Sequence, residues 1–198
     1  QKNTSAYVIR ELELQHLPHI NRWRNDRDVI DLLGNNFLYI ANEVDEKWYD
    51  DYLANRSAAA RFAIIDADKQ KMIGTAQLTS IHSINRSAQF SIMIGEKDYW
   101  SKGAGSAATE LVLHHGFDDL NLNRIFLTVL TSNLRAIFLY RKFGFLQEGV
   151  IRQSVYKRGI FRDQVLMSLL REDYYRAYHG VSLQHSRSIP LSRSPLIK

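Results

Sequence analysis

Cysteine is absent from this sequence. Disulfides, thiolate metal sites and a cysteine nucleophile are therefore excluded, while a reducing compartment is permitted. Long apolar runs are absent too: no segment approaches the ~20 apolar residues that span a membrane, and the first five residues lack the apolar centre of a signal peptide. We therefore expect a soluble, cytoplasmic protein with no metal site.

Acidic residues are missing from the C-terminal end of the chain. Between Tyr174 and Lys198 there is no Asp or Glu, and 4 of the 26 Lys and Arg residues fall there. The other 22 nearly balance the 21 acidic residues, so most of the net charge of +5 belongs to this end, and we expect a basic tail over 179–198 that contains Ser, Arg and Pro. The body lacks the basic excess typical of nucleic-acid binding, and we expect no such partner for it.

The length of the remaining chain fits one domain. A chain of 198 residues with 45% hydrophobic content buries roughly two-thirds of its unfolded surface on folding. There is no internal repeat. We therefore expect a single domain with one core over residues 6–174.

Alternating or continuous apolar segments predict the strands of a sheet. Three segments separated by short polar turns indicate consecutive antiparallel strands, and a later β-branched run is typical of a central strand buried on both faces. The last two segments predict a hairpin that turns near Gly159. The expected strands lie at 6–10, 61–66, 71–80, 89–94, 124–130, 145–152 and 161–170.

Apolar residues at helical spacing predict four helices, at 13–24, 45–53, 104–117 and 133–143. Asp45 is the expected N-cap of the second, and Gly144 is expected to end the fourth. Together these elements predict an α/β fold. Its central sheet is mixed, mostly antiparallel and six- to seven-stranded, with about four flanking helices.

A glycine-rich turn precedes the third helix. Gly103 and Gly105 let the backbone approach a ligand, and the unpaired first-turn N–H groups with the helix dipole favour an anion. The spacing does not match the dinucleotide fingerprint, because Ala108 stands in place of the third glycine, and it does not match a P-loop. Taken alone, the segment is either a diphosphate site or an ordinary tight turn.

A second motif favours the diphosphate site. Residues 133–145, Asn-Leu-Arg-Ala-Ile-Phe-Leu-Tyr-Arg-Lys-Phe-Gly-Phe, and residues 99–106, Tyr-Trp-Ser-Lys-Gly-Ala-Gly-Ser, together resemble the GCN5-related N-acetyltransferase (GNAT) superfamily. The resemblance runs from about residue 7 to about residue 174. The Tyr-Trp-x-Lys-Gly-x-Gly form of residues 99–105 is similar to a branch that holds ribosomal-protein N-terminal, spermidine and nucleotide-linked amino-sugar acetyltransferases. Trp100 departs from the pattern, where Gln or Arg is usual, at a position that contributes mainly its backbone N–H.

The resemblance implies acetyl-CoA as the cosubstrate, bound where two neighbouring parallel strands splay apart. Backbone groups of Ile92, Met93 and Ile94 would hold the pantetheine arm, and one of their N–H groups would polarise the thioester carbonyl. Without the resemblance, these three residues are simply a buried strand. The diphosphate would lie on the turn formed by Trp100, Ser101, Lys102, Gly103, Ala104, Gly105 and Ser106.

Two residues of the second motif receive roles from the resemblance. Tyr140 would be the general acid that protonates the departing sulfur, since a phenol with a pKa near 10 holds its proton at neutral pH. The alternative is a core tyrosine bonded to a backbone carbonyl. Asn133 would contact the cofactor; the alternative is that it is only the N-cap of the helix that follows it.

The general base is not evident from the sequence. Relatives often carry Glu where this chain has Gln89, and a neutral amide cannot take a proton. Gln89 can hold a water that does so, or the amine can lose its proton through a water chain on entry. His82 and Glu148 are substitutes, although each is more typical of a surface residue.

The acceptor is also open. Five aromatic residues around the first two helices would either line the acceptor loops or simply pack; they are Trp23, Tyr39, Trp48, Tyr49 and Tyr52. Residues 22–25, Arg-Trp-Arg-Asn, resemble the amino-sugar acetyltransferases, whose acceptors are anionic. A polyamine would favour an acidic cleft, for which only Asp45, Glu46, Asp50 and Asp51 form a cluster.

We therefore predict an acetyl-CoA-dependent N-acetyltransferase that acts by direct attack in a ternary complex. The expected acceptor is the primary amine of a small molecule, an amino sugar or a polyamine, and the alternative is a peptide N-terminus. A non-catalytic acyl-CoA-binding domain is the alternative from another class. We also expect a homo-oligomer.

Overall fold

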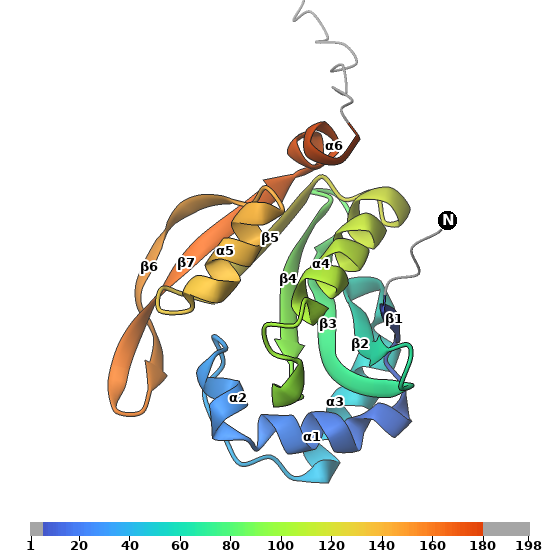
Figure 1. Cartoon of the computed structure of the whole chain (residues 1–198), viewed down its shortest axis with the longest axis vertical. Coiled ribbons are helices and arrows are strands. Elements are labelled where there is room, and N and C mark those ends of the chain that lie inside the picture. The colour runs from blue at the N-terminus through green and yellow to red at the C-terminus, as the bar shows by residue number, and fades with distance from the viewer. Residues whose placement is uncertain (1–5, 180–198) are drawn as a thin grey trace, which may run out of the picture.

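The structure, a computed structural model, describes residues 6–179 and contains one seven-stranded sheet (Figure 1). The strands are β1 (Tyr7–Glu11), β2 (Ala60–Asp66), β3 (Lys71–His82), β4 (Ser87–Ile94), β5 (Arg124–Leu130), β6 (Leu146–Lys157) and β7 (Ile160–Leu170). Their order in the sheet is β1-β2-β3-β4-β5-β7-β6. Only β4 and β5 pair in parallel, so the expected mixed, mostly antiparallel sheet is confirmed.

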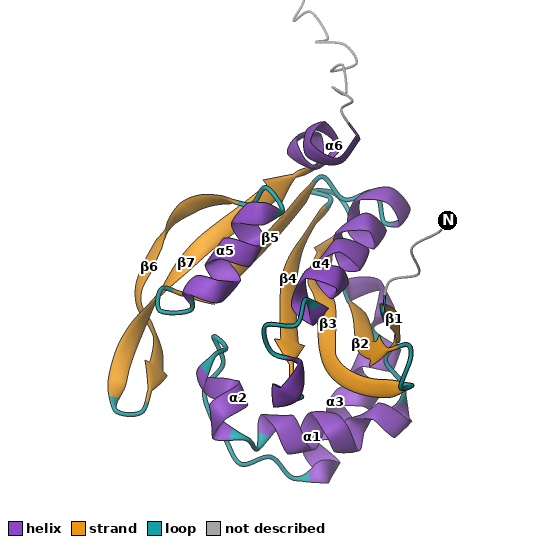
Figure 2. Cartoon of the chain, viewed as in Figure 1, coloured by secondary structure: helices purple, strands orange, loops and turns teal. Residues whose placement is uncertain are grey.

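Six α-helices accompany the sheet within the described residues (Figure 2). They are α1 (Leu17–Arg24), α2 (Arg27–Asp31), α3 (Asn42–Ala54), α4 (Ala104–His114), α5 (Leu134–Lys142) and α6 (Arg171–His179). α2 and α6 were not predicted. A five-residue helix such as α2 is too short to show a helical period. None of these helices is long and apolar enough to cross a membrane.

The predicted start of the second helix was wrong. α3 begins at Asn42, and Asp45 lies inside its first turn, only 1% exposed. Asp45 forms an ion pair with Arg24 and accepts a hydrogen bond from Asn21 Nδ2 at 2.8 Å. The tendency of Asp to cap a helix is overridden here, because a buried carboxylate needs these two partners from α1.

Pro18 also shifts a boundary. It lies in the first turn of α1, which is preceded by a short 3-10 segment over Leu14–His16 instead of continuous helix from residue 13. At this position the missing N–H of proline costs no helical hydrogen bond. Residues 180–198 of the expected basic tail lie outside the described residues.

Helices cover both faces of the sheet. On one face, Ile64, Ile73 and Leu78 pack with residues of α4 and α5, such as Val112 and Ile137. The neighbouring strand residues point to the other face, because side chains alternate along a strand. There Ala63, Ile65 and Met72 pack with Leu17, Ile20 and Trp23 of α1, while Trp48 and Tyr49 of α3 cover their edge.

β4 and β5 stay together over only a short length. Their pairing runs from Ser87 opposite Arg124 to Gln89 opposite Phe126. Beyond this point β4 continues against β3 as far as Ile94, and β5 continues against β7 as far as Leu130. The two strands therefore diverge between α4 and α5 (Figure 1), which confirms the expected splay of the sheet.

The bend after β4 depends on a glycine that contacts an indole ring. A Cβ atom added to Gly95 would lie 2.0 Å from Trp23 Cδ2, so even alanine does not fit without displacing α1. We expect Gly95→Ala to lower the free energy of unfolding by about 1–3 kcal/mol, as for other overpacked core positions.

Gly149 in β6 is the matched control, since a Cβ atom there meets nothing within 4 Å. Gly149→Ala should leave the urea midpoint within error of that of the wild type. Equal midpoints for the two variants would show that the contact of Gly95 with Trp23 is not restrictive.

Candidate active site

A cavity of about 830 Å³ opens where β4 and β5 diverge. It runs from the glycine turn, past the ends of both strands, to the side covered by α1, α2 and the loop that follows α2. Ten of the predicted site residues line it: Ile92, Met93, Ile94, Trp100, Ser101, Gly103, Gly105, Ser106, Asn133 and Tyr140. Lys102 and Ala104 do not, since Lys102 points to solvent and Ala104 is completely buried.

The glycine turn has the backbone of an anion-binding helix start. Gly103 is the N-cap of α4 and lies in the left-handed region, with φ of 85°, where glycine is favoured. At the N-terminus of α4, the first helical hydrogen bond is donated by the Ala107 N–H to the Gly103 carbonyl. The N–H groups of Ala104, Gly105 and Ser106 therefore have no acceptor within the helix.

Gly105 keeps the space beside these N–H groups open. A Cβ atom at this position would have Leu139 Cδ2 at 3.7 Å as its nearest neighbour, and the φ of Gly105 is not positive. Gly105 therefore does not need the left-handed backbone conformation that Gly103 has. What matters at this position is the room that the absent side chain leaves.

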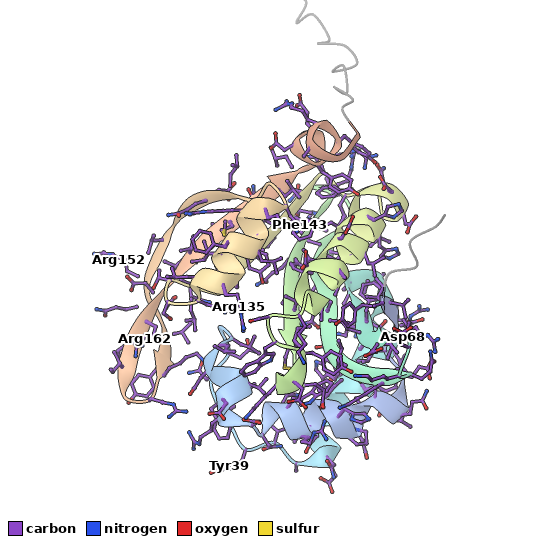
Figure 3. All side chains as sticks on the ribbon, in the orientation of Figure 1. Tyr39, Asp68, Arg135, Phe143, Arg152 and Arg162 are labelled. Atoms are coloured by element: carbon purple, nitrogen blue, oxygen red, sulfur yellow. The ribbon has the colours of Figure 1, made fainter. Side chains whose placement is uncertain are left out.

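Two cations reach this turn from α5, and sequence reasoning missed both. Arg135 donates to Ser101 Oγ at 3.1 Å, and Lys142 donates to Ser106 Oγ at 3.5 Å. Figure 3 shows Arg135 extending from the start of α5 towards the loop after β4. They lie two helical turns apart on the same face, a spacing that was visible in the sequence. Positive charge and free N–H groups together suit a phosphate.

Backbone groups of β4 face the gap. Gly95 and Glu96 both donate to the Ile73 carbonyl, so the alternation of an antiparallel ladder directs Met93 towards β3. Ile92 and Ile94 then direct their N–H and C=O groups away from β3, where β5 has already diverged.

Trp100 occupies the end of this edge. Its Nε1 donates to the Ile94 carbonyl at 2.8 Å, and the guanidinium of Arg135 lies 5.7 Å from its ring centre. The residue therefore does more than contribute a backbone N–H. It satisfies a carbonyl that β5 would otherwise bind, and so keeps the end of β4 separate from β5.

Tyr140 lines the cavity from α5 and is 7% exposed. Its ring packs edge-on against Phe90 of β4, and burial raises the pKa of its hydroxyl to about 12. The alternative of a core tyrosine bonded to a backbone carbonyl is not what the structure shows, since no hydrogen bond joins this hydroxyl to another group within residues 6–179. The hydroxyl is a protonated donor throughout the neutral pH range.

Asn133 caps α5. Its Oδ1 accepts a hydrogen bond from the Ala136 N–H at 3.2 Å, and its Nδ2 donates to the Leu32 carbonyl at 2.9 Å. The side chain therefore holds the loop after α2 against the start of α5. It also lines the cavity, so that a contact with the cofactor stays a prediction.

Neither proposed substitute for the general base lies in the cavity. Glu148 receives two hydrogen bonds from Arg124, at 2.6 and 2.5 Å, and this contact lowers the pKa of Glu148 to about 2. His82 lies on a separate surface depression near the end of β3. Gln89, by contrast, lines the cavity.

The segment Arg22-Trp-Arg-Asn25 anchors the acceptor side of the cavity. Arg22 and Trp23 Nε1 both donate to Glu96 after β4, and Arg24 pairs with Asp45 of α3. Asn25 exchanges two hydrogen bonds with the backbone of Ile40, at 2.9 and 3.0 Å. Four consecutive residues thus fix three different segments, and Arg24 also lines the cavity.

Most of the aromatic residues around the first helices pack instead of lining the cavity. Trp23 and Tyr52 are buried, and the Tyr52 hydroxyl donates a hydrogen bond to Glu11. Tyr49 packs against the buried residues between the sheet and α1. Tyr39 is 83% exposed at the edge of the molecule (Figure 3). Among the five, only Trp48 lines the cavity.

One cavity thus joins a helix start suited to an anion with the gap between two diverging strands. Residues 7–146 match the family described as the acetyltransferase (GNAT) domain, and the chain belongs to this family. It is therefore an acetyl-CoA-dependent N-acetyltransferase, which confirms the predicted enzyme class.

Relatives of known activity match over most of their length. The spermidine N(1)-acetyltransferase of Vibrio cholerae is 30% identical over 170 residues, which are 86% of this chain and 96% of the relative. That of Escherichia coli K12 is 28% identical, over 84% of this chain and 87% of the relative. The crystal structure of the Vibrio cholerae spermidine N-acetyltransferase with CoA and spermine has a TM-score of 0.81 at 29% identity, covering 86% of this chain and 99% of that one.

The space at Gly105 provides a test of the glycine turn. We expect Gly105→Val to weaken acetyl-CoA binding at least tenfold, because the isopropyl group enters the space beside the free N–H groups. Isothermal titration calorimetry measures this change. Ala107→Val is the control, since it carries the same β-branched penalty on the same helix but does not line the cavity. Equal affinities for the two variants would remove the phosphate role from this turn.

The raised pKa of Tyr140 also has a consequence for stability. Between the ordinary tyrosine pKa of 10 and the folded value of about 12, the unfolded chain loses this proton first, so stability falls as pH rises through that window. We expect the melting temperature of the wild type to fall more steeply than that of Tyr140→Phe between pH 9.5 and 11.5. Below pH 9 the difference between the two melting temperatures should be constant. Parallel curves over the whole range would mean that the hydroxyl is accessible to solvent.

Proposed function

We propose that the cavity forms a ternary complex in which an amine enters from the α1–α2 side and attacks acetyl-CoA bound between α4 and α5. The observation that carries this proposal is the continuity of one cavity, from the glycine turn through the gap between β4 and β5 to the far face of the sheet. Acetyl-CoA supplies the acetyl thioester. The open space at Gly105, the free N–H groups of α4 and the cations of α5 fit its diphosphate.

The N–H groups of Ile92 and Ile94 are the proposed contacts for the pantetheine arm, since both are directed into the gap. One of them would donate to the thioester carbonyl oxygen as negative charge develops on it. The Met93 backbone is engaged with β3, which makes it the least suited of the three predicted contacts. The turn from Trp100 to Ser106 would hold the diphosphate, with Arg135 and Lys142 as additional partners.

Tyr140 is the proposed donor to the leaving sulfur. In the reaction the amine nitrogen forms a bond to the acetyl carbon, the carbon–sulfur bond breaks, and the sulfur takes the electron pair. The Tyr140 hydroxyl would donate its proton to that sulfur and recover one from solvent after the product leaves. Its high pKa makes it a weak acid but ensures that it is protonated when the sulfur departs.

The amine must reach the thioester as a neutral nucleophile. No Asp, Glu or His lines the cavity within the described residues. Gln77, Gln89 and Ser91 do line it, and their polar groups suit a water that carries the proton away. The nearby arginines, Arg24 and Arg61, disfavour an ammonium by charge repulsion, which lowers the pKa of an entering amine.

A small-molecule amine is the proposed acceptor. Two of the relatives are spermidine N(1)-acetyltransferases, which supports this class over a protein substrate. A putative ribosomal N-acetyltransferase of Bacillus subtilis matches only 52% of this chain, at 29% identity. The cytoplasmic setting stays a prediction.

A homo-oligomer is the proposed assembly. The edge strand β6 and its partner β7 expose several large apolar side chains, namely Val150, Ile151, Tyr156, Ile160 and Phe161. Such a surface on an edge strand suits a contact with another copy of the chain. A dodecameric structure of the Vibrio cholerae enzyme, which is 27% identical in sequence, supports this proposal.

The role of Tyr140 is tested by Tyr140→Phe. We expect kcat to fall roughly ten- to a thousandfold while the Kd for acetyl-CoA changes little, because the hydroxyl serves the developing thiolate and not the bound thioester. Steady-state kinetics and calorimetry on one preparation measure both quantities. Full turnover together with a lowered melting temperature would mean that Tyr140 is only a core residue.

A further inference from the structure

The acceptor side of the cavity contains a cation without a carboxylate partner. Arg61 of β2 lines the cavity and is half-buried, and none of the ion pairs within residues 6–179 includes it. Its guanidinium lies 4.5 Å from the ring centre of Trp48 and donates to Gln77 Oε1, while its Nε is buried without a hydrogen-bond partner. Removing a positive charge from water without a counter-ion is costly, and an anion entering the cavity would offset that cost.

Arg61 begins a row of polar side chains that leads to the reacting centre. Arg61, Gln77 and Ser91 are cross-strand neighbours on β2, β3 and β4, and they point to the same face. Gln77 Nε2 donates to Ser91 Oγ at 2.8 Å. Ile92, whose backbone faces the gap, follows Ser91 directly. A ligand held at Arg61 therefore lies along the row that ends where the acetyl group would be.

The second arginine on this side reinforces the positive charge. Arg24 lines the same cavity, and its repulsion contributes, after desolvation, to the lowered pKa of Arg61. Asp45 pairs with Arg24 but does not line the cavity, and the four other acidic residues of α3, Glu43, Glu46, Asp50 and Asp51, are outside it as well. The charge exposed to a ligand here is positive.

We propose that the acceptor is an amine that also carries an oxyanion, a carboxylate or a phosphate, and that Arg61 binds this group while the amine lies near Ile92. The inference rests on the proposed function and deepens it. It separates this chain from its spermidine-acetylating relatives, because a polycation would place further positive charge against Arg61 and Arg24. Trp48 positions the guanidinium of Arg61 by stacking.

Matched acceptor pairs test the proposal without any mutation. Glucosamine and glucosamine 6-phosphate differ by a phosphate, and in 4-aminobutanoate a carboxylate replaces one protonated aminomethyl group of putrescine. CoA release with each amine gives kcat/KM. We expect the anionic member of at least one pair to be favoured roughly ten- to a hundredfold, the value of a hydrogen bond to a charged group. The pair that responds identifies the oxyanion.

Variants then assign the preference to Arg61. Arg61→Gln should abolish the preference for the anionic acceptor by raising the KM of that acceptor, and Arg61→Lys should keep part of the preference. The Kd for acetyl-CoA should stay unchanged in both variants. Lys47→Gln is the control, because it removes one positive charge from an exposed position on α3 that does not line the cavity. It should keep the full preference.

Three results would overturn the inference. These are a higher kcat/KM for spermidine or putrescine than for every anionic amine, equal values within both pairs, or an unchanged preference in Arg61→Gln. In each case CoA is still released with some amine, so the acetyltransferase function stands. If acetyl-CoA binds but no amine of either charge releases CoA, the proposed function fails, and the inference about the acceptor fails with it.

Discussion

The parallel contact between β4 and β5 ends after three residue pairs, and the active site depends on that interruption. The unpaired strand edges need other partners, because a buried backbone group without one is costly. The Trp100 indole binds the Ile94 carbonyl, and β5 completes its other edge against β7. The backbone groups of Ile92 and the N–H of Ile94 are then left facing the cavity.

The interruption also lets one cavity pass from one face of the sheet to the other. Residues 90 and 92 alternate with 89, 91 and 93 between its faces, so that β4 contributes to both ends of the cavity. On the side of α4 and α5, helix N–H groups and cations suit a diphosphate. On the side of α1 and α3, Arg61 and Arg24 line the space and acidic residues do not, which favours a neutral amine over an ammonium.

Local signals identified one half of this site better than the other. Gly103 marks a left-handed backbone position, Gly105 marks a place where a side chain is missing beside the start of a helix, and Tyr140 belongs to a motif with fixed spacing. Arg135 and Lys142 carry no such mark, since a lysine or an arginine on a helix is usually solvated. Glu148 shows the opposite error: it had the chemistry of a base, but Arg124 and Ser168 bind it away from the cavity.

The sequence by itself determined the seven strands, the four longer amphipathic helices, the glycine turn and the family, because each depends on periodicity or on residues close together in the chain. Only the tertiary structure decided which side chains share the cavity. Arg61 comes to the site through its register with Gln77, and Asp45 is withdrawn from it by Arg24 of another helix. Charge in a cavity depends on pairings between distant segments, and these are set by packing, which no local pattern in the chain reports.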